Sequence, residues 1–146
     1  MKKILKSFSI CLIIIAMVST TAFAAAPNDP AEPQSNRYIW TTTVGIAPLG
    51  NGKIEVDFSV TATGKKADLG ATRVTIYNES GQSVKIIRYT DSGYAYMIGH
   101  NKSAHGGSVF YQGVSGQRYY AILTYFAGTL GGSGGGASLK SPAIYA

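Results

Sequence analysis

The chain has 146 residues, of which 45% are hydrophobic and 14% charged, with a formal net charge of +6. That length is sufficient for one domain with a single buried core. Cys11 is the single cysteine, which excludes both a disulfide framework and a thiolate zinc site.

Residues 1–26 have the three parts of a secretory signal peptide. Three lysines lie within the first six residues, an apolar run covers residues 8–18, and small residues at 22–26 form two overlapping cleavage sites. The predicted leader is therefore removed. We expect the remainder to be a secreted, extracellular protein.

Two kinds of membrane attachment are alternatives to cleavage. The apolar run is about 11 residues long, whereas a membrane-spanning helix needs roughly 20. Lipid attachment at Cys11 would require a small residue before it, and Ile10 occupies that position. We therefore expect no stable membrane anchor.

Removal of the leader lowers the net charge. Three of the 13 basic residues lie in the leader and all seven acids follow it, so ten bases against seven acids leave +3. The basic residues are spread along the sequence, whereas nucleic-acid-binding domains show a clustered basic face. We expect solvated charges and no nucleic-acid partner, with weak attraction to anionic envelope polymers as an alternative.

A proline-rich linker is predicted at residues 27–36, before a domain over residues 37–146. Strands are predicted at 37–47, 53–63, 71–77, 83–89, 94–98, 108–112, 117–127 and 137–145. Between these strands, 99–107 is predicted to be a polar loop, and the glycine-rich residues 131–136 a flexible loop.

The clearest strand signal is the alternation over residues 53–63. Its apolar residues are predicted to face inward and its polar residues to face water, because successive side chains of a strand point to opposite faces. Val74 and Ile76 are predicted to face inward in the next strand. The apolar residues of the first segment are Ile54, Val56, Phe58, Val60 and Ala62.

Seven or eight short, evenly spaced strands favour a single antiparallel β-sandwich. In the segment Gly116-Gln117-Arg118-Tyr119-Tyr120-Ala121, tyrosines follow a glycine turn. The segment resembles the start of strand F in immunoglobulin and fibronectin type III sandwiches, where a tyrosine hydroxyl caps a backbone group. With its leader, length and strand order, the chain resembles small secreted β-sandwich proteins of unknown function from Firmicutes. That resemblance implies no catalytic residues.

The two histidines, His100 and His105, lie in one predicted loop. Two imidazoles alone do not make a metal site, because a third ligand is needed and the loop contains no acidic residue. We therefore predict no metal and no cofactor. An ordinary polar loop is the favoured interpretation.

Two sets of residues have side chains of catalytic type. Ser115 lies in Gly113-Val114-Ser115-Gly116, which lacks the Gly-x-Ser-x-Gly spacing of a hydrolase elbow. Glu55 and Asp57 fall on one face of a strand, about 7 Å apart by strand rise, but the chain is too short to wall a glycosidase cleft. We predict a protein that is not an enzyme.

The aromatic residues point instead to binding. Alternation places Tyr119 and Tyr120 on opposite faces, so some tyrosines must lie outside the core. Exposed Tyr and Trp stack on sugars or anchor protein interfaces. Packing around a limited core is the alternative. The predicted contact residues are Tyr94, Tyr96, His100, His105 and Trp40.

These observations predict a secreted, non-enzymatic module that binds an envelope glycan or a protein partner. A secreted effector, such as an antimicrobial protein or an inhibitor, is the first alternative. A minimal hydrolase is the second.

Overall fold

The computed structural model describes residues 37–146, which form one antiparallel sheet of seven strands. The strands are β1 (Ile39–Gly50), β2 (Lys53–Asn78), β3 (Ser83–Arg88), β4 (Ile98–Gln112), β5 (Arg118–Gly128), β6 (Gly134–Lys140) and β7 (Ile144–Tyr145). A short 3-10 helix, η2 (Ala95–Met97), precedes β4. The all-β prediction is confirmed, whereas the predicted signal peptide and linker lie outside the described residues.

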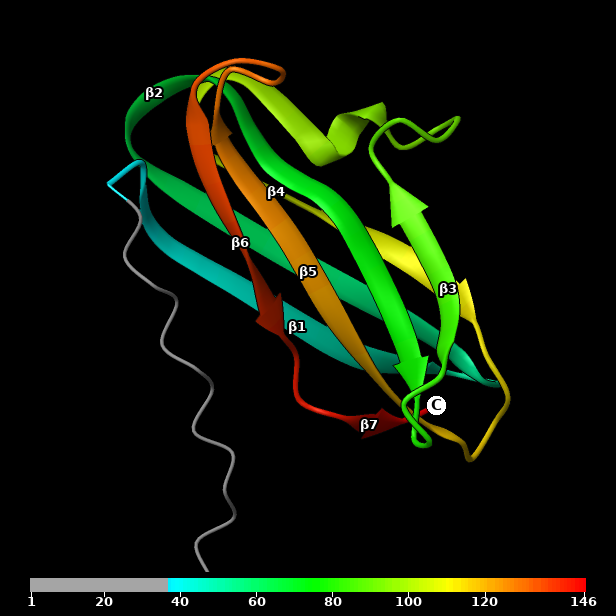
Figure 1. Ribbon diagram of the computed structural model, residues 1–146. Coiled ribbons are helices and arrows are strands. Elements are labelled where there is room, and N and C mark those ends of the chain that lie inside the picture. The colour runs from blue at the N-terminus through cyan, green and yellow to red at the C-terminus, as the bar shows by residue number, and fades with distance from the viewer. Residues whose placement is uncertain (1–36) are drawn as a thin grey trace, which may run out of the picture.

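Strand β2 connects the two layers of the molecule (Figure 1). Its first part pairs with β1 on one side and β4 on the other, which makes the rear layer. Its second part pairs with β3 and β5, and β5 also pairs with β6, which makes the front layer. The sheet is thus continuous and curls into a half-barrel. The predicted sandwich of two separate sheets is not confirmed.

The bend of β2 lies between the predicted strands 53–63 and 71–77, which are one continuous strand. Thr61 pairs with Ala104 and Lys66 with Lys102, so four residues of β2 oppose one residue of β4. Such an excess on one strand bends it and increases its twist. Gly64, with φ of 131°, lies among the extra residues. The residues between the two predicted strands therefore form a bend within β2 and not a loop that joins two separate strands.

The predictions for residues 94–107 were wrong in detail. Residues 95–97 form η2 where a strand was predicted, and 99–107 belong to β4 where a loop was predicted. This stretch is polar and glycine-rich, which disfavours strands in isolation. Backbone pairing with β2 on one side holds it extended, and most of its side chains are exposed to water.

The core lies between the two layers, and the alternation predicted for 53–63 is confirmed. All five of its apolar side chains are buried, as are Val74 and Ile76. The front layer contributes Leu123 and Tyr125, and η2 contributes Met97, which is fully buried. One strand therefore supplies core side chains to both layers, which leaves the outer faces of the layers for recognition.

Candidate functional site

The structure brings three of the predicted contact residues together near the start of β4. The Tyr94 and Tyr96 rings are 6.2 Å apart, and a ring nitrogen of His105 lies 2.8 Å from the Tyr96 carbonyl. The Tyr96 hydroxyl donates to the Ser108 carbonyl at 2.6 Å, and burial raises its pKa, as does the neighbouring Tyr94. Tyr94 packs against the core. Much of this cluster is engaged in holding η2 against β4.

His100 is separate from that cluster. Its side chain is 75% exposed, and its Nδ1 lies 2.8 Å from a carboxylate oxygen of Asp68. The other oxygen of Asp68 accepts a hydrogen bond from the Leu130 backbone N–H at 2.7 Å. This bond, together with the one from His100, holds the pKa of Asp68 below its usual value. The two histidines thus have different partners.

No group of three or more His, Cys, Asp or Glu side chains within residues 37–146 is placed to hold a metal ion. His105 is directed toward a backbone carbonyl and His100 toward a single carboxylate. Neither arrangement supplies the three or four ligands that a zinc site needs.

Trp40, the fifth predicted residue, is in β1 and is 79% exposed. The register places β2 between β1 and β4, so a strand separates Trp40 from the histidines. The predicted residues therefore do not form one continuous surface.

A second surface covers the outside of the front layer. Side chains of β5 alternate between buried and half-buried, and the half-buried set faces outward. Their register partners on β2, β3 and β6 share that side. We call this surface the front face. Its aromatic and basic members are Arg73, Tyr77, Arg88, Tyr120, Phe126 and Lys140.

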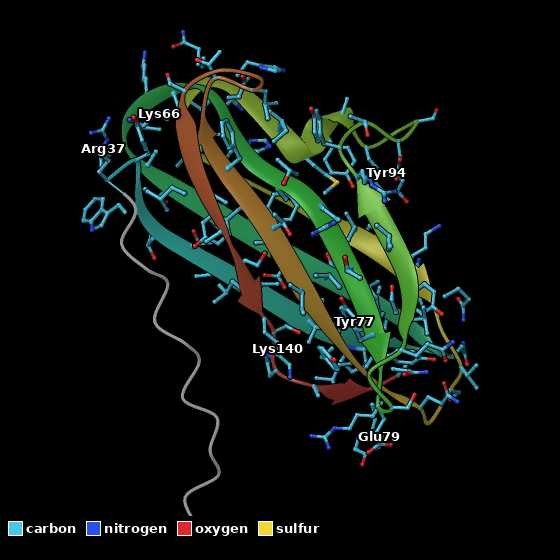
Figure 2. All side chains as sticks on the ribbon, in the orientation of Figure 1. Arg37, Lys66, Tyr77, Glu79, Tyr94 and Lys140 are labelled. Carbon is cyan, nitrogen blue, oxygen red and sulfur yellow. The ribbon has the colours of Figure 1, made fainter. Side chains whose placement is uncertain are left out.

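Tyr77 and Tyr120 form the best-defined contact on the front face. Their rings are stacked, with centroids 5.1 Å apart and planes 7° from parallel. The ammonium group of Lys140 lies 4.2 Å from the centre of the Tyr120 ring, within cation–π distance. Figure 2 shows Tyr77 and Lys140 toward one end of the front layer, with Tyr94 toward the other end.

Phe126 lies farther along β5, six residues beyond Tyr120. A Cβ at Gly134 would come within 2.4 Å of the Phe126 ring, so a glycine is needed there for the ring to lie over β6. Gly136 is the register partner of Phe126 on that strand. With glycines at both positions, β6 has no side chain that screens this ring from water.

The charges on the front face are all of one sign. Arg73 and Arg88 are direct register partners, and neither forms an ion pair in the described part of the chain. Like charges placed opposite each other across two strands are destabilising. Among the described acids, Glu55 and Asp57 are in the rear layer, Asp68 is at the bend, and Glu79 is in a turn. Asp91 is in the turn after β3, where its carboxylate accepts a hydrogen bond from the Arg88 backbone N–H at 2.8 Å.

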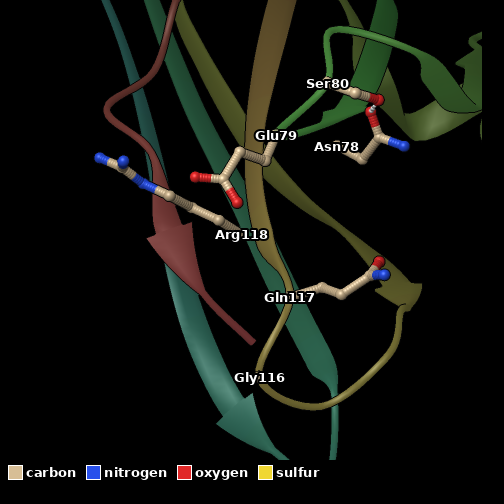
Figure 3. A pocket seen from close by; sticks show the side chains of 6 residues that line it. All are labelled: Asn78, Glu79, Ser80, Gly116, Gln117 and Arg118. Carbon is tan, nitrogen blue, oxygen red and sulfur yellow. Dashed lines mark hydrogen bonds between the residues drawn. The ribbon is translucent and has the colours of Figure 1, made fainter.

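A shallow hollow lies beside one end of the front face, between two turns. It measures about 400 Å³ and its lining includes Glu79 and Arg118 (Figure 3). The Ser80 hydroxyl, also in the lining, donates to the Asn78 side chain at 2.7 Å. The lining contains no histidine, and the Ser80 hydroxyl is bonded to the Asn78 side chain and not to the Glu79 carboxylate.

The front face was missed by the sequence-based prediction because its basic residues are far apart in the chain. Arg73, Arg88 and Lys140 lie on three strands and gather only through pairing. The sequence does indicate one feature of the front face. Alternation predicts that Tyr119 and Tyr120 face opposite sides of the sheet, and this prediction is confirmed. Tyr119 is 1% exposed, and its hydroxyl accepts a hydrogen bond from the Val114 N–H, as expected of the predicted tyrosine cap.

No protein-family model matches the chain, and no curated protein or solved structure matches it either. In residues 37–146, no helix is both long and apolar enough to span a membrane.

Proposed function

We propose that this protein is a secreted, non-enzymatic module that binds an envelope glycan through the front face. The observation that carries the proposal is the outward row along β5, which has an aromatic side chain at each end. Tyr120 and Phe126 are about 20 Å apart by strand rise. That separation suits an extended chain of several sugars.

The chemistry of the row fits sugar rings. Tyrosine and phenylalanine offer apolar area to the C–H faces of sugars, and tyrosine adds a hydroxyl for hydrogen bonding. Thr124 and Ser138 lie between the aromatic ends and their hydroxyl groups are 3.2 Å apart. The face thus combines apolar and hydroxyl groups on a firmly paired strand, which supports recognition with little rearrangement.

The test is binding of the secreted protein to immobilised cell-envelope polysaccharides, compared with Tyr120→Ala/Phe126→Ala. We expect the double variant to lose most of the binding and to keep its folded circular dichroism spectrum. The matched control is Phe110→Ala, because Phe110 is an exposed aromatic on the rear layer with Lys53 5.1 Å from its ring.

Two results would contradict the proposal. The first is wild-type protein that binds no polysaccharide and recovers a discrete protein instead, which would favour the protein-partner alternative. The second is loss of glycan binding in Tyr94→Ala/Tyr96→Ala with no loss in the front-face variant, which would move the site to the cluster predicted from sequence.

A further inference from the structure

We infer that the glycan bound by the front face is polyanionic and lies along β5. This inference rests on the proposed function and adds the charge of the ligand and its direction. It is drawn from the basic side chains of the face, whereas the proposed function is drawn from its aromatic ones.

Arg73 and Arg88 form a pair of like charges on the front face. They occupy directly opposite positions on β2 and β3 and both are exposed. Neither guanidinium group forms an ion pair within the described residues, although the Asp91 carboxylate accepts a hydrogen bond from the Arg88 backbone N–H at 2.8 Å. Such a pair of like charges lowers the stability of the free protein. An anionic group between the two guanidinium groups would remove the repulsion and accept hydrogen bonds from both.

Lys140 places a third basic group on the other side of β5. It pairs with Ile122 and reaches the Tyr120 ring from β6, across β5 from the two arginines. The basic groups therefore flank β5 on both sides. A chain lying along β5 would place its sugar rings on the aromatic residues and its charges beside the bases.

The front face also lacks opposing charge. The strand segments that form it, 70–77, 84–88, 120–126 and 136–140, contain no Asp or Glu. The rear layer presents Glu55 and Asp57 near its centre. An approaching polyanion would therefore meet basic groups without acids on the strands of the front face, whereas Glu55 and Asp57 accompany Lys53 in the rear layer.

The anionic groups of such a glycan can be carboxylates or phosphates, and both would fit. The experiment uses the full secreted protein and measures affinity for polygalacturonate, poly(glycerol phosphate), neutral dextran and single-stranded DNA. We expect binding to at least one of the first two polymers, much weaker binding to dextran and DNA, and weakening as salt is raised, since salt screens exposed charges.

The test variant is Arg73→Gln/Arg88→Gln/Lys140→Gln. We expect its affinity for the polyanion to fall by about tenfold or more, because three attractive charges are removed from one face. The matched control is Lys53→Gln/Lys65→Gln/Lys102→Gln, which removes the same charge from other surfaces and should retain most of the affinity. The Arg73→Lys/Arg88→Lys variant preserves the positive charges. If the glutamine variant does not fold, the affinity of this lysine variant for the polyanion provides a second measurement.

The outcomes separate the two proposals. Equal binding of dextran and polyanion, unaffected by salt and by the glutamine variant, would overturn the polyanion inference and leave glycan binding standing. Equal losses of polyanion affinity in the test and control variants would overturn the assignment of the binding site to the front face. Tighter binding to DNA than to any glycan, or no binding to any polymer, would overturn both.

Discussion

At the scale of single residues, the Asp68 side chain links three segments of the chain through hydrogen bonds. Its carboxylate joins β2, where it lies, to His100 in β4 and to the Leu130 backbone between β5 and β6. The side chain is only 14% exposed. The bond from the part-buried backbone N–H should outweigh that from the exposed histidine, because water screens surface ion pairs.

Replacement Asp68→Asn should lower the free energy of unfolding by about 1–2 kcal/mol near pH 7, since a charge-assisted hydrogen bond is lost. The pKa of Asp68 is held below its usual 3.8 in the folded protein. Its contribution is therefore present above that pH and lost as the pH falls through the lower folded value. Urea unfolding at a series of pH values should show the two proteins converging in acid.

The control for this prediction is Asp57→Asn, which removes an exposed carboxylate from the rear layer. It should change stability little at any pH. A difference between wild type and Asp68→Asn that stayed constant down to strongly acidic pH would show that the carboxylate charge is not responsible.

At the scale of elements, the bend of β2 depends on a close approach of backbones. Gly70 has φ of 149°, and a Cβ there would lie 2.1 Å from the Met97 carbonyl oxygen. Side chains are disfavoured at such φ, and a backbone oxygen cannot move aside as a flexible side chain can. The junction of β2, η2 and β4 thus requires glycine at this position.

We expect Gly70→Ala to destabilise the protein by more than about 2 kcal/mol, because it combines backbone strain with a clash. Gly81→Ala is the matched substitution: Gly81 also has positive φ, but a Cβ there would meet no atom within 4 Å. Its cost should be about 1 kcal/mol. Thermal unfolding of both variants tests this, and equal losses would contradict the clash with the Met97 carbonyl.

At the scale of the whole molecule, the continuous sheet couples its two layers. The 26-residue β2 strand belongs to both, so neither layer can lose its core without exposing side chains from the other. The described residues contain no cysteine, so packing and backbone hydrogen bonds provide the stability. Such an arrangement should unfold in one cooperative transition.

The test is Leu123→Ala, which removes a fully buried side chain from the front layer. We expect a loss of about 2–5 kcal/mol. Hydrogen exchange should speed up equally for the most protected amides of β4, in the rear layer, and of β5. Faster exchange confined to β5 would show that the layers unfold independently. Val114→Ala, at an exposed position, should change stability by less than about 0.5 kcal/mol.

The fold class and the core of β2 follow from the order of the amino acids alone. Period-two alternation identifies the buried side of a strand without knowledge of its partners, because the geometry is local. Ile54, Val56 and Phe58 are predictable as core residues for that reason. The leader is also predicted from a local pattern, although it lies outside the described residues.

The positions of the polar segments and of the basic residues depend on tertiary structure. Residues 99–107 form a strand because their backbone groups pair with β2. The local composition of this segment does not indicate that pairing. Likewise, Arg73, Arg88 and Lys140 come together through the pairing of strands distant in sequence. The front face is a product of register, which no single segment specifies.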